Sequence, residues 1–408
     1  MNAEFEVVIQ SLVYGGSGMG RLADGRAVFI PFTLPGEKVK ARVKEEKKGF
    51  VMAEVLEILQ PSSQRIVPRC PHYGMCGGCH YQHIPYELQV AYKKEIFVEQ
   101  LQRIGNMEIP LISQVMESDV AWNYRNALQF HLSPRGKLGF ERSNSNDTLE
   151  IQECHLPCSA LTETWPQLDF EYIPEIERVE LRQGDEDEIL LALYSQDATP
   201  PEFETELPIS AVHISPQGQI ILAGNDHLNI SVHGKSMRVS AGSFFQVNHF
   251  IAEKMVSILL EKTHPTKEMI VLDGYCGVGL FSVFLAPLVS RCLGVEVSPS
   301  ACQDFAFNLD ACDNVELYEG TVEEVLPLLE VKPNLILLDP PRSGIDRRAL
   351  AALVRMAPAQ LVYISCNPAT LARDAKHLIE AGYTLEESIL LDMFPQTYHI
   401  ESLNIFSK

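Results

Sequence analysis

Short apolar runs alternate with stretches of helical length in the last third of the chain, from about residue 266. This alternation is typical of strands joined by helices, and it predicts an α/β domain with a doubly wound, Rossmann-like parallel sheet. Open sheets of this kind bind ligands at the edge where their parallel strands end. The predicted strands are 269–273, 292–296, 335–339 and 361–365.

Residues 1–58 have a different pattern, in which short β-rich runs are separated by glycine-containing turns. The pattern predicts a small, OB-like β-barrel of five strands. Five lysines and Arg42 lie between residues 38 and 48, on one predicted hairpin. This hairpin is either an ordinary solvated surface or a nucleic-acid-binding one, because small barrels often bind nucleic acid. The predicted strands are 5–13, 27–30, 38–43 and 51–58.

The region between these parts is predicted to contain one long helix and a second set of short strands. Residues 85–104 carry apolar side chains at helical spacing, and Gly105 follows as the expected C-cap. Residues 120–240 alternate as short strands. We expect three domains: a barrel (1–58), a β-rich central domain (59–240) and the α/β domain (241–408). The helix 85–104 belongs to the central range but is free to pack on the α/β domain.

Three cysteines lie close together with the spacing C-x5-C-x2-C, at Cys70, Cys76 and Cys79. Thiolates this close converge naturally on one metal centre, and a fourth ligand must then come from another segment. We favour Cys154 for that position, with Cys158 as the alternative. Four sulfur ligands suit an iron–sulfur cluster or zinc, and the spacing alone leaves both open.

A glycine-rich turn, G-x-x-G-x-G at residues 274–279, joins the first predicted strand of the α/β domain to a helix. Glu296 ends the next strand, where an acidic side chain can accept both ribose hydroxyls of a nucleoside cofactor. The glycine spacing differs from the G-x-G-x-x-G that cradles a pyrophosphate in dinucleotide sites. These features favour S-adenosylmethionine over NAD.

Two reactive side chains are expected at the same sheet edge as this turn: Cys366 follows one predicted strand, and Glu401 lies in a later segment. C5 of uracil is not nucleophilic enough to take a methyl group from a sulfonium unaided. A thiolate that adds at C6 makes C5 nucleophilic, and a base must then remove the C5 proton before the thiolate can leave. Cys366 and Glu401 can supply this nucleophile and base, with His399 as an alternative base.

Together these motifs resemble the RNA uracil-C5 methyltransferases, and more narrowly their iron–sulfur branch with an N-terminal TRAM barrel. The best-known members of that branch modify 23S ribosomal RNA. The resemblance covers essentially the whole chain. It rests on the barrel and on C-x5-C-G-G-C-x-Y-Q-H (70–83), S-F-F-Q-V-N (243–248), D-G-Y-C-G-V-G (273–279), D-P-P-R (339–342), S-C-N-P (365–368) and D-M-F-P (392–395) leading to H-I-E (399–401).

The resemblance implies functions for particular residues. Cys366 would be the nucleophile, Glu401 the proton acceptor and Arg125 an RNA contact. Leu280 and the Gly320-Thr321 pair depart from residues common near the cofactor in this family. The residues implied for S-adenosylmethionine are Gln246, Tyr275, Glu296 and Asp339. Those implied for a [4Fe–4S] cluster, in preference to zinc, are Cys70, Cys76, Cys79 and Cys154.

The charge distribution bears on how an RNA would bind. The net charge is −21, and residues 1–150 are balanced, with 17 basic and 17 acidic side chains. An RNA is therefore expected to contact the N-terminal part and local clefts. The resemblance favours 23S ribosomal RNA, with transfer RNA as the alternative, and it implies no obligate protein partner.

No apolar run approaches the roughly 18 residues of a membrane span, so we expect a cytoplasmic protein with no membrane association. Three other activities fit parts of the sequence. A radical methylthiotransferase would need C-x3-C-x2-C, and a cytosine-C5 methyltransferase would not be expected to carry the cysteine cluster. A non-catalytic RNA-binding protein with a structural cluster would have no use for Cys366 and Glu401.

Overall fold

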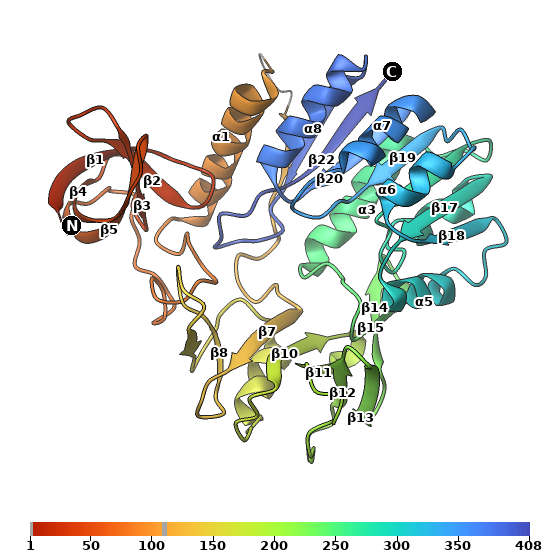
Figure 1. Cartoon of the computed structure of the whole chain (residues 1–408), viewed down its shortest axis with the longest axis horizontal. Helices are drawn as coiled ribbons and strands as arrows, with labels where there is room; N and C mark the ends of the chain where they lie inside the picture. The colour runs from red at the N-terminus through yellow and green to blue at the C-terminus, as the bar shows by residue number, and fades with distance from the viewer. Residues whose placement is uncertain (1–2, 108–111) are drawn as a thin grey trace.

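The computed structural model describes residues 3–107 and 112–408. Figure 1 shows a closed barrel at one end of the molecule, an eight-stranded sheet with helices at the other end, and a seven-stranded sheet below them. A separate hairpin of β14 (His227–Val232) and β15 (Lys235–Ser240) connects the seven-stranded sheet to the α/β domain.

The N-terminal barrel has five strands in the order β1-β2-β3-β5-β4, as predicted. Strand β2 begins inside the glycine-rich segment that the sequence pattern assigned to a turn. Packing requires its glycines, because a Cβ at Gly18 would overlap Thr33 and one at Gly20 would lie 2.7 Å from a methyl group of Val7. The strands are β1 (Glu4–Leu12), β2 (Ser17–Arg21), β3 (Ala27–Pro31), β4 (Lys38–Glu46) and β5 (Phe50–Gln60).

The eight-stranded sheet has the order β18-β17-β16-β19-β20-β22-β21-β6. The five strands from β18 to β20 run parallel, in agreement with the predicted Rossmann-like fold, and β22 runs antiparallel between β20 and β21. Its strands are β6 (Ile112–Met116), β16 (Ile270–Gly274), β17 (Arg291–Glu296), β18 (Val315–Glu319), β19 (Leu335–Leu338), β20 (Gln360–Ser365), β21 (Thr384–Leu391) and β22 (Glu401–Ser407).

The central strands of this sheet are buried on both faces. Leu335 and Leu337 of β19 pack in one hydrophobic core, whereas Ile336 and Leu338 pack in another. Since alternate strand residues point to opposite faces, each face is covered by its own layer of helices. No helix among the described residues is long and apolar enough to cross a membrane. The α-helices outside the central region are α3 (His249–Thr263), α4 (Ser282–Leu285), α5 (Pro299–Asn308), α6 (Val322–Val325), α7 (Arg347–Met356) and α8 (Pro368–Glu380).

Helix α1 (Tyr86–Gly105) falls within the range predicted for the central domain, 59–240, but it packs against α8 of the α/β domain (Figure 1). Its C-cap is Asn106, which has a φ of 56°, and not the predicted Gly105, which is still helical. Asparagine tolerates this left-handed conformation better than most residues, so it can end a helix as glycine does.

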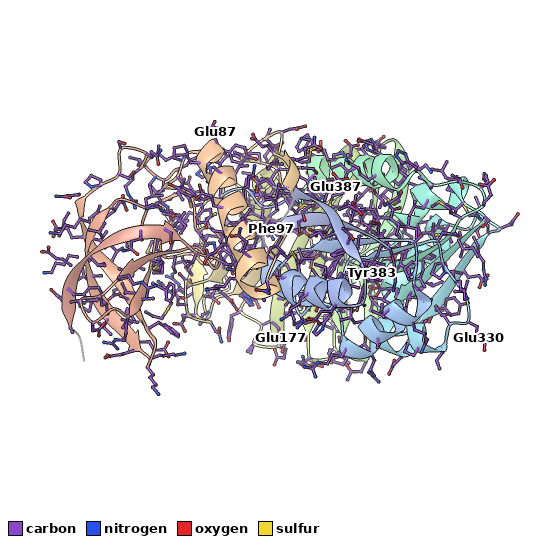
Figure 2. The ribbon with its side chains drawn as sticks, turned by 90° about the horizontal axis from the view of Figure 1, so that it is seen from above. Glu87, Phe97, Glu177, Glu330, Tyr383 and Glu387 are labelled. Carbon is purple, nitrogen blue, oxygen red and sulfur yellow. The ribbon has the colours of Figure 1, made fainter. Side chains whose placement is uncertain are left out.

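The barrel is joined to the α/β domain by a shared hydrophobic core. Leu12 and Leu34 of the barrel are buried in the same cluster as Phe97 of α1 and Tyr383, which precedes β21. Figure 2 shows α1, with Phe97 labelled, between the barrel and the C-terminal helices. The barrel is therefore docked on the α/β domain by buried apolar contacts.

The seven-stranded sheet has the order β13-β12-β11-β10-β7-β8-β9, which agrees with the predicted series of short strands. A core around Phe130 and Trp165 covers one of its faces, beneath the short helix α2 (Ser159–Thr164). Its strands are β7 (Ala127–Leu132), β8 (Leu138–Glu141), β9 (Thr148–Glu150), β10 (Ile176–Gln183), β11 (Ile189–Ser195), β12 (Ser210–Ser215) and β13 (Gly218–Ala223).

Candidate active site

The parallel strands of the eight-stranded sheet carry predicted site residues to a single edge. Strands β16, β17, β19 and β20 all run in the same direction, so their carboxyl ends lie along that edge. This is the edge at which doubly wound sheets bind their ligands. The residues at or directly after these ends are Tyr275, Glu296, Asp339 and Cys366.

Glu401 reaches the same edge because β22 runs antiparallel to β20. The register pairs Ser365, the last residue of β20, with Ser402. The residue after β20 therefore lies beside the first residue of β22, and the negative charge of Glu401 raises the pKa of Cys366. The structure brings the predicted nucleophile and base together from segments on different strands.

The turn that carries Cys366 is fixed by hydrogen bonds to the D-P-P-R turn. Asn367 caps α8, its Oδ1 accepting from the Ala369 amide at 3.1 Å, and its Nδ2 donates to the Arg342 carbonyl at 3.1 Å. Burial, with the charges of Glu401 and Asp339, raises the pKa of Cys366 to about 12, although Arg342 lowers it in part. The thiol is consequently protonated at neutral pH before a substrate binds.

The carboxyl group of Glu401 is almost fully buried, with the residue 5% exposed. Burial, and then the charge of Asp339, raise its pKa well above the usual value, and Arg342 acts in the opposite direction. A carboxylate with a raised pKa is suited to accept a proton near neutral pH. The alternative base, His399, lies against Arg342, and burial and that charge lower the pKa of His399 to about 3.

The glycine-rich turn after β16 is held in a left-handed backbone conformation. Tyr275 has a φ of 62° and Gly277 a φ of 53°. Such a conformation is uncommon for tyrosine, and strained residues of this kind concentrate at functional sites. The turn is tied to β17, because Glu296 accepts hydrogen bonds from the amides of Gly277 at 2.9 Å and Ser298 at 2.7 Å.

A cavity of about 820 Å³ opens beside this turn. Tyr275 and Glu296 line it, together with Gly320-Thr321, the pair that departs from the family's usual residues. Asp339 and Gln246 are not among the described residues that line it. Asp339 is half-buried next to β16, and Gln246 lies on the segment before α3, where its carbonyl accepts from Asn126 at 3.1 Å.

A buried carboxylate, Asp273, lies next to Asp339 and was not assigned a function from the sequence. Its Oδ2 accepts from the Ser282 hydroxyl at 2.6 Å, whereas its Oδ1 is buried and has no hydrogen-bond partner among the described residues. Burial is the main cause that raises the pKa of both Asp273 and Asp339 to about 7. Two such acids facing one site favour a cationic ligand.

Four cysteines line a different cavity, of about 890 Å³, between the barrel, the central sheet and the C-terminal segment. They are the predicted set Cys70, Cys76, Cys79 and Cys154, whereas Cys158 is not among the lining residues. Burial raises the pKa of each of the four thiols. Within the described residues, however, no three His, Cys, Asp or Glu side chains are arranged as a formed metal site.

The lysine-rich hairpin of the barrel is not a free basic surface. Lys38, Lys40, Arg42, Lys44 and Lys47 all form ion pairs with glutamates of the barrel. These pairs are exposed and add little stability, but they neutralise the hairpin. The cavity at the cysteines is instead lined by basic side chains of the central domain, namely Arg125, Arg142 and Arg178.

Two residues near the Cys366–Glu401 pair were not singled out from the sequence. Arg342 had a signal, since it belongs to the D-P-P-R motif, but no function was given to it. Tyr14 lies in a glycine-rich turn of the barrel, which has no periodicity to reveal a site. The charges of Cys366 and Glu401 contribute to raising the pKa of Tyr14, so its phenol is within electrostatic reach of both.

Comparison with known proteins agrees with this geometry. Residues 204–408 match the family model described as tRNA (Uracil-5-)-methyltransferase, and residues 2–56 match the TRAM domain. An uncharacterized RNA methyltransferase of Aquifex aeolicus is 36% identical, with 98% of this chain and 97% of that protein covered. The chain belongs to the tRNA (uracil-5-)-methyltransferase family.

Other relatives of this uracil-5-methyltransferase extend over the whole chain. An uncharacterized RNA methyltransferase of Halalkalibacterium halodurans is 32% identical over 99% of this chain and 97% of its own length. The crystal structure of a tRNA (uracil-54, C5)-methyltransferase of Pyrococcus abyssi in complex with S-adenosyl-L-homocysteine has a TM-score of 0.75 at 23% identity, covering 98% of this chain and 100% of that one. The shared fold spans all parts of the molecule.

These findings confirm the predicted enzyme class, an RNA (uracil-C5-)-methyltransferase with an N-terminal TRAM barrel. They also support S-adenosylmethionine as the methyl donor of the family.

Proposed function

We propose that this methyltransferase modifies C5 of a specific uridine in RNA, with Cys366 as the nucleophile and Glu401 as the base. The observation that carries the proposal is the placement of a thiol and a buried carboxylate side by side, one at the end of β20 and the other at the start of β22. A non-catalytic RNA-binding protein would gain nothing from two mutually repelling acidic groups at a ligand-binding edge.

The reaction needs one proton to leave Cys366 and another to leave C5 of the uracil. The Cys366 thiol loses its proton to solvent, and the resulting thiolate adds to C6, so that the electrons of the C5–C6 double bond make C5 nucleophilic. S-adenosylmethionine, when bound, would supply the methyl group for C5, and its sulfur–methyl bond would break to leave S-adenosylhomocysteine. Glu401 then accepts the C5 proton, the double bond forms again, and the sulfur of Cys366 leaves C6. Arg342 favours the anionic forms of both groups.

The electrostatics support Glu401 rather than His399 as the base. Glu401 has a raised pKa, whereas the imidazole of His399 has a pKa lowered to about 3 and is a weak proton acceptor. His399 is held against the guanidinium of Arg342 at 3.3 Å. We assign it the task of positioning Arg342.

For the methyl donor we propose the four residues implied by the family resemblance: Gln246, Tyr275, Glu296 and Asp339. Tyr275 and Glu296 line the cavity beside the glycine-rich turn, which supports their assignment. The adjacent carboxylates of the buried Asp273, whose Oδ1 is unpartnered among the described residues, and the half-buried Asp339 fit a ligand that carries positive charge, as a sulfonium and an α-amino group do.

We further propose that Cys70, Cys76, Cys79 and Cys154 hold a [4Fe–4S] cluster. The four thiols line one cavity, and four soft sulfur ligands fit such a cluster. The amide of Gly78 donates to the sulfur of Cys76 at 3.3 Å, the kind of contact that stabilises cluster ligands.

Metal analysis tests this cluster proposal. Protein purified without oxygen should contain about four irons per chain. Cys154→Ser should lose the iron, and the matched variant Cys158→Ser should retain it. Stoichiometric zinc without iron would reject the cluster, and iron loss in the Cys158 variant alone would mean that the fourth ligand was assigned wrongly.

For the substrate we propose 23S ribosomal RNA, on the resemblance to the iron–sulfur branch with a TRAM barrel. Transfer RNA is the second candidate, favoured by the description of the matching family model. Purified enzyme, S-adenosylmethionine and each RNA should be incubated and the products mapped by mass spectrometry. 5-Methyluridine in ribosomal RNA alone supports the first candidate, and in transfer RNA alone the second. Its absence from both would reject the proposed reaction.

We propose the barrel (1–58) and the central domain (59–240) as the RNA-binding parts and residues 241–408 as the catalytic part. Helix α1 and strand β6 fall within the second range but pack on the third. The placement of three arginines in the cleft beside the cysteines supports RNA binding by the central domain.

A further inference from the structure

One residue of the N-terminal barrel reaches the catalytic centre. Tyr14 lies in the turn between β1 and β2, and its ring packs edge-on against Tyr398 with the ring centroids 5.8 Å apart. Tyr398 in turn lies against His399, at 4.3 Å between ring centroids, two residues before Glu401. The barrel thus contacts the segment that delivers the proposed base.

The turn that carries Tyr14 is fitted closely against this segment. Gly16 has a φ of +85°, and a Cβ there would lie 3.2 Å from both Tyr398 Cδ1 and His80 Cβ. Gly15, with a φ of +101°, has nothing within 4 Å of its Cβ position. Both glycines have a backbone conformation with positive φ, but only Gly16 is packed closely against other residues, His80 and Tyr398. This packing fixes the position of the turn and therefore of Tyr14.

The hydroxyl of Tyr14 is available to a ligand. It makes no hydrogen bond within residues 3–107 and 112–408, and it is not among the side-chain oxygens sealed from solvent. Buried tyrosine hydroxyls usually find a partner, and an accessible one beside a catalytic pair is suited to bind the substrate. Burial, with the nearby charges, raises the pKa of Tyr14 to about 12, so the phenol is a hydrogen-bond donor at neutral pH.

We propose that Tyr14 contacts the RNA at the methyl-transfer centre, donating a hydrogen bond to an oxygen of the nucleotide that Cys366 attacks, and so makes the barrel part of the active site. This inference rests on the proposed function. An oxygen acceptor on a uridine is either a base carbonyl or a phosphate or ribose oxygen. A base carbonyl gains negative charge when the thiolate adds at C6, so a bond to it strengthens during the reaction, whereas the other two oxygens keep their charge.

The test compares Tyr14→Phe with wild type, and with Tyr172→Phe as a control on an exposed tyrosine of the central domain. Loss of one neutral hydrogen bond should lower kcat/KM for the RNA roughly 3- to 10-fold. The affinity for S-adenosylmethionine and the midpoint of thermal unfolding should not change. A fall in kcat indicates a base carbonyl, and a rise in KM alone indicates a phosphate or ribose oxygen.

A second pair of variants tests the placement of the turn. Gly16→Ala should lower kcat/KM for RNA more than Gly15→Ala, because the two share the strain of a positive φ but only the first displaces the turn from His80 and Tyr398. The affinity for RNA can also be compared between Cys366→Ala and the double variant Cys366→Ala with Tyr14→Phe. Because neither variant turns over, this comparison measures the contact of Tyr14 with RNA apart from catalysis.

Three results would overturn the inference. The first is Tyr14→Phe with wild-type kcat/KM. The second is a loss of S-adenosylmethionine affinity or of thermal stability equal to the loss of activity, which would mean a structural role. The third is Gly15→Ala and Gly16→Ala with equal effects. Failure of the proposed function is distinguishable from these, because the wild-type enzyme would then produce no 5-methyluridine at all.

Discussion

In the proposed reaction Cys366 and Glu401 have different tasks, so replacing each should have a different result. Cys366→Ala cannot form the bond to C6 and should be inactive, with no covalent RNA complex. Glu401→Gln keeps the size of the side chain but removes its basicity. It should transfer the methyl group and then stall as a protein–RNA adduct, with turnover lowered by about 10²- to 10⁴-fold.

Denaturing electrophoresis with labelled S-adenosylmethionine would detect that adduct. It should carry the methyl label and require both RNA and S-adenosylmethionine. His399→Gln is the matched variant, and it should turn over without a trapped complex. If His399→Gln accumulated the adduct and Glu401→Gln turned over normally, the two residues would exchange functions in the mechanism.

The adjacent acids Asp273 and Asp339, near the proposed cofactor site, should give the stability of the ligand-free enzyme a particular pH dependence. Asp273 and Asp339 have folded-state pKa values raised to about 7, far above that of an aspartate in an unfolded chain. The folded state therefore binds protons more tightly. Their contribution to stability is fully present below about pH 4 and is lost as the pH rises through 7.

Thermal unfolding at pH 6 and pH 8 measures this effect. The midpoint should be lower at pH 8, and Asp273→Asn, which cannot ionise, should reduce the difference. Added S-adenosylmethionine should raise the midpoint more at pH 8 than at pH 6, because the cationic ligand favours the ionised acids. An Asp273→Asn enzyme with the same pH dependence as wild type would show that these acids do not titrate as the structure indicates.

At the scale of elements, a buried ion pair fastens α1 to the segment that precedes Glu401. Lys93 Nζ donates to Asp392 at 2.6 Å and to the Phe394 carbonyl at 2.9 Å, and both charged side chains are at most 5% exposed. Lys93→Met would leave the carboxylate of Asp392 buried and unpaired. The free energy of unfolding should fall by about 3–5 kcal/mol.

Urea denaturation of three variants checks this expectation. Lys94→Met, on the exposed side of the same helix, should have little effect. The double replacement Lys93→Met with Asp392→Leu should recover much of the loss, because two apolar side chains need no partner. A single Lys93→Met protein as stable as the Lys94 variant would mean that the pair does not hold the two segments together.

The elements also show how far sequence patterns reach. The strands β16, β17, β19 and β20 were predictable because each is a continuous apolar run between helical stretches. β18 (V-E-L-Y-E) and β6 (I-S-Q-V-M) are only partly buried and mix polar with apolar residues, so neither has the apolar run that marks a strand. β6 pairs with β21 through contacts between distant parts of the chain, which local periodicity cannot reveal.

The candidate site, too, has residues that local sequence patterns can indicate and others that depend on contacts between distant parts of the chain. Cys366 and Glu401 could be picked out because the chemistry needs a thiol and a base, and Cys366 follows a predicted strand, whereas the strand that begins at Glu401 was not predicted. Tyr14 could not, because its place beside them depends on the docking of the barrel through Leu12 and Leu34. Packing between domains leaves no signature in either partner's sequence.

At the scale of the whole molecule, the charges indicate which surface binds the RNA. Four of the five hairpin lysines (Lys38, Lys40, Lys44 and Lys47) are paired with glutamates, whereas Arg178 lies over the ring of Tyr194 at 3.6 Å and its Nε has no hydrogen-bond partner among the described residues. Arg125→Gln and Arg178→Gln should each reduce the salt dependence of RNA binding by about one unit of log–log slope.

The matched control is Lys40→Gln in the barrel, which removes a lysine already paired with Glu4. Its salt slope should stay close to that of wild type. A flattened slope for Lys40→Gln, with unchanged slopes for the two arginine variants, would assign phosphate binding to the hairpin. Deleting the whole barrel is a poorer test, because it would expose the core around Leu12 and Leu34 and disturb cofactor binding as well.

The strand order of the eight-stranded sheet also determines the sequence in which its strands can pair during synthesis. β6 leaves the ribosome early, but its partner β21 is made only after all the parallel strands, and β21 joins the sheet through β22, the strand that begins with Glu401. Until β22 inserts, β20 has an open edge, and β6 has no place in the sheet because its partner β21 joins the sheet only through β22. Contacts so distant in sequence form slowly and leave exposed strand edges prone to aggregation, so this enzyme should depend on chaperones during synthesis more than a domain built from local contacts.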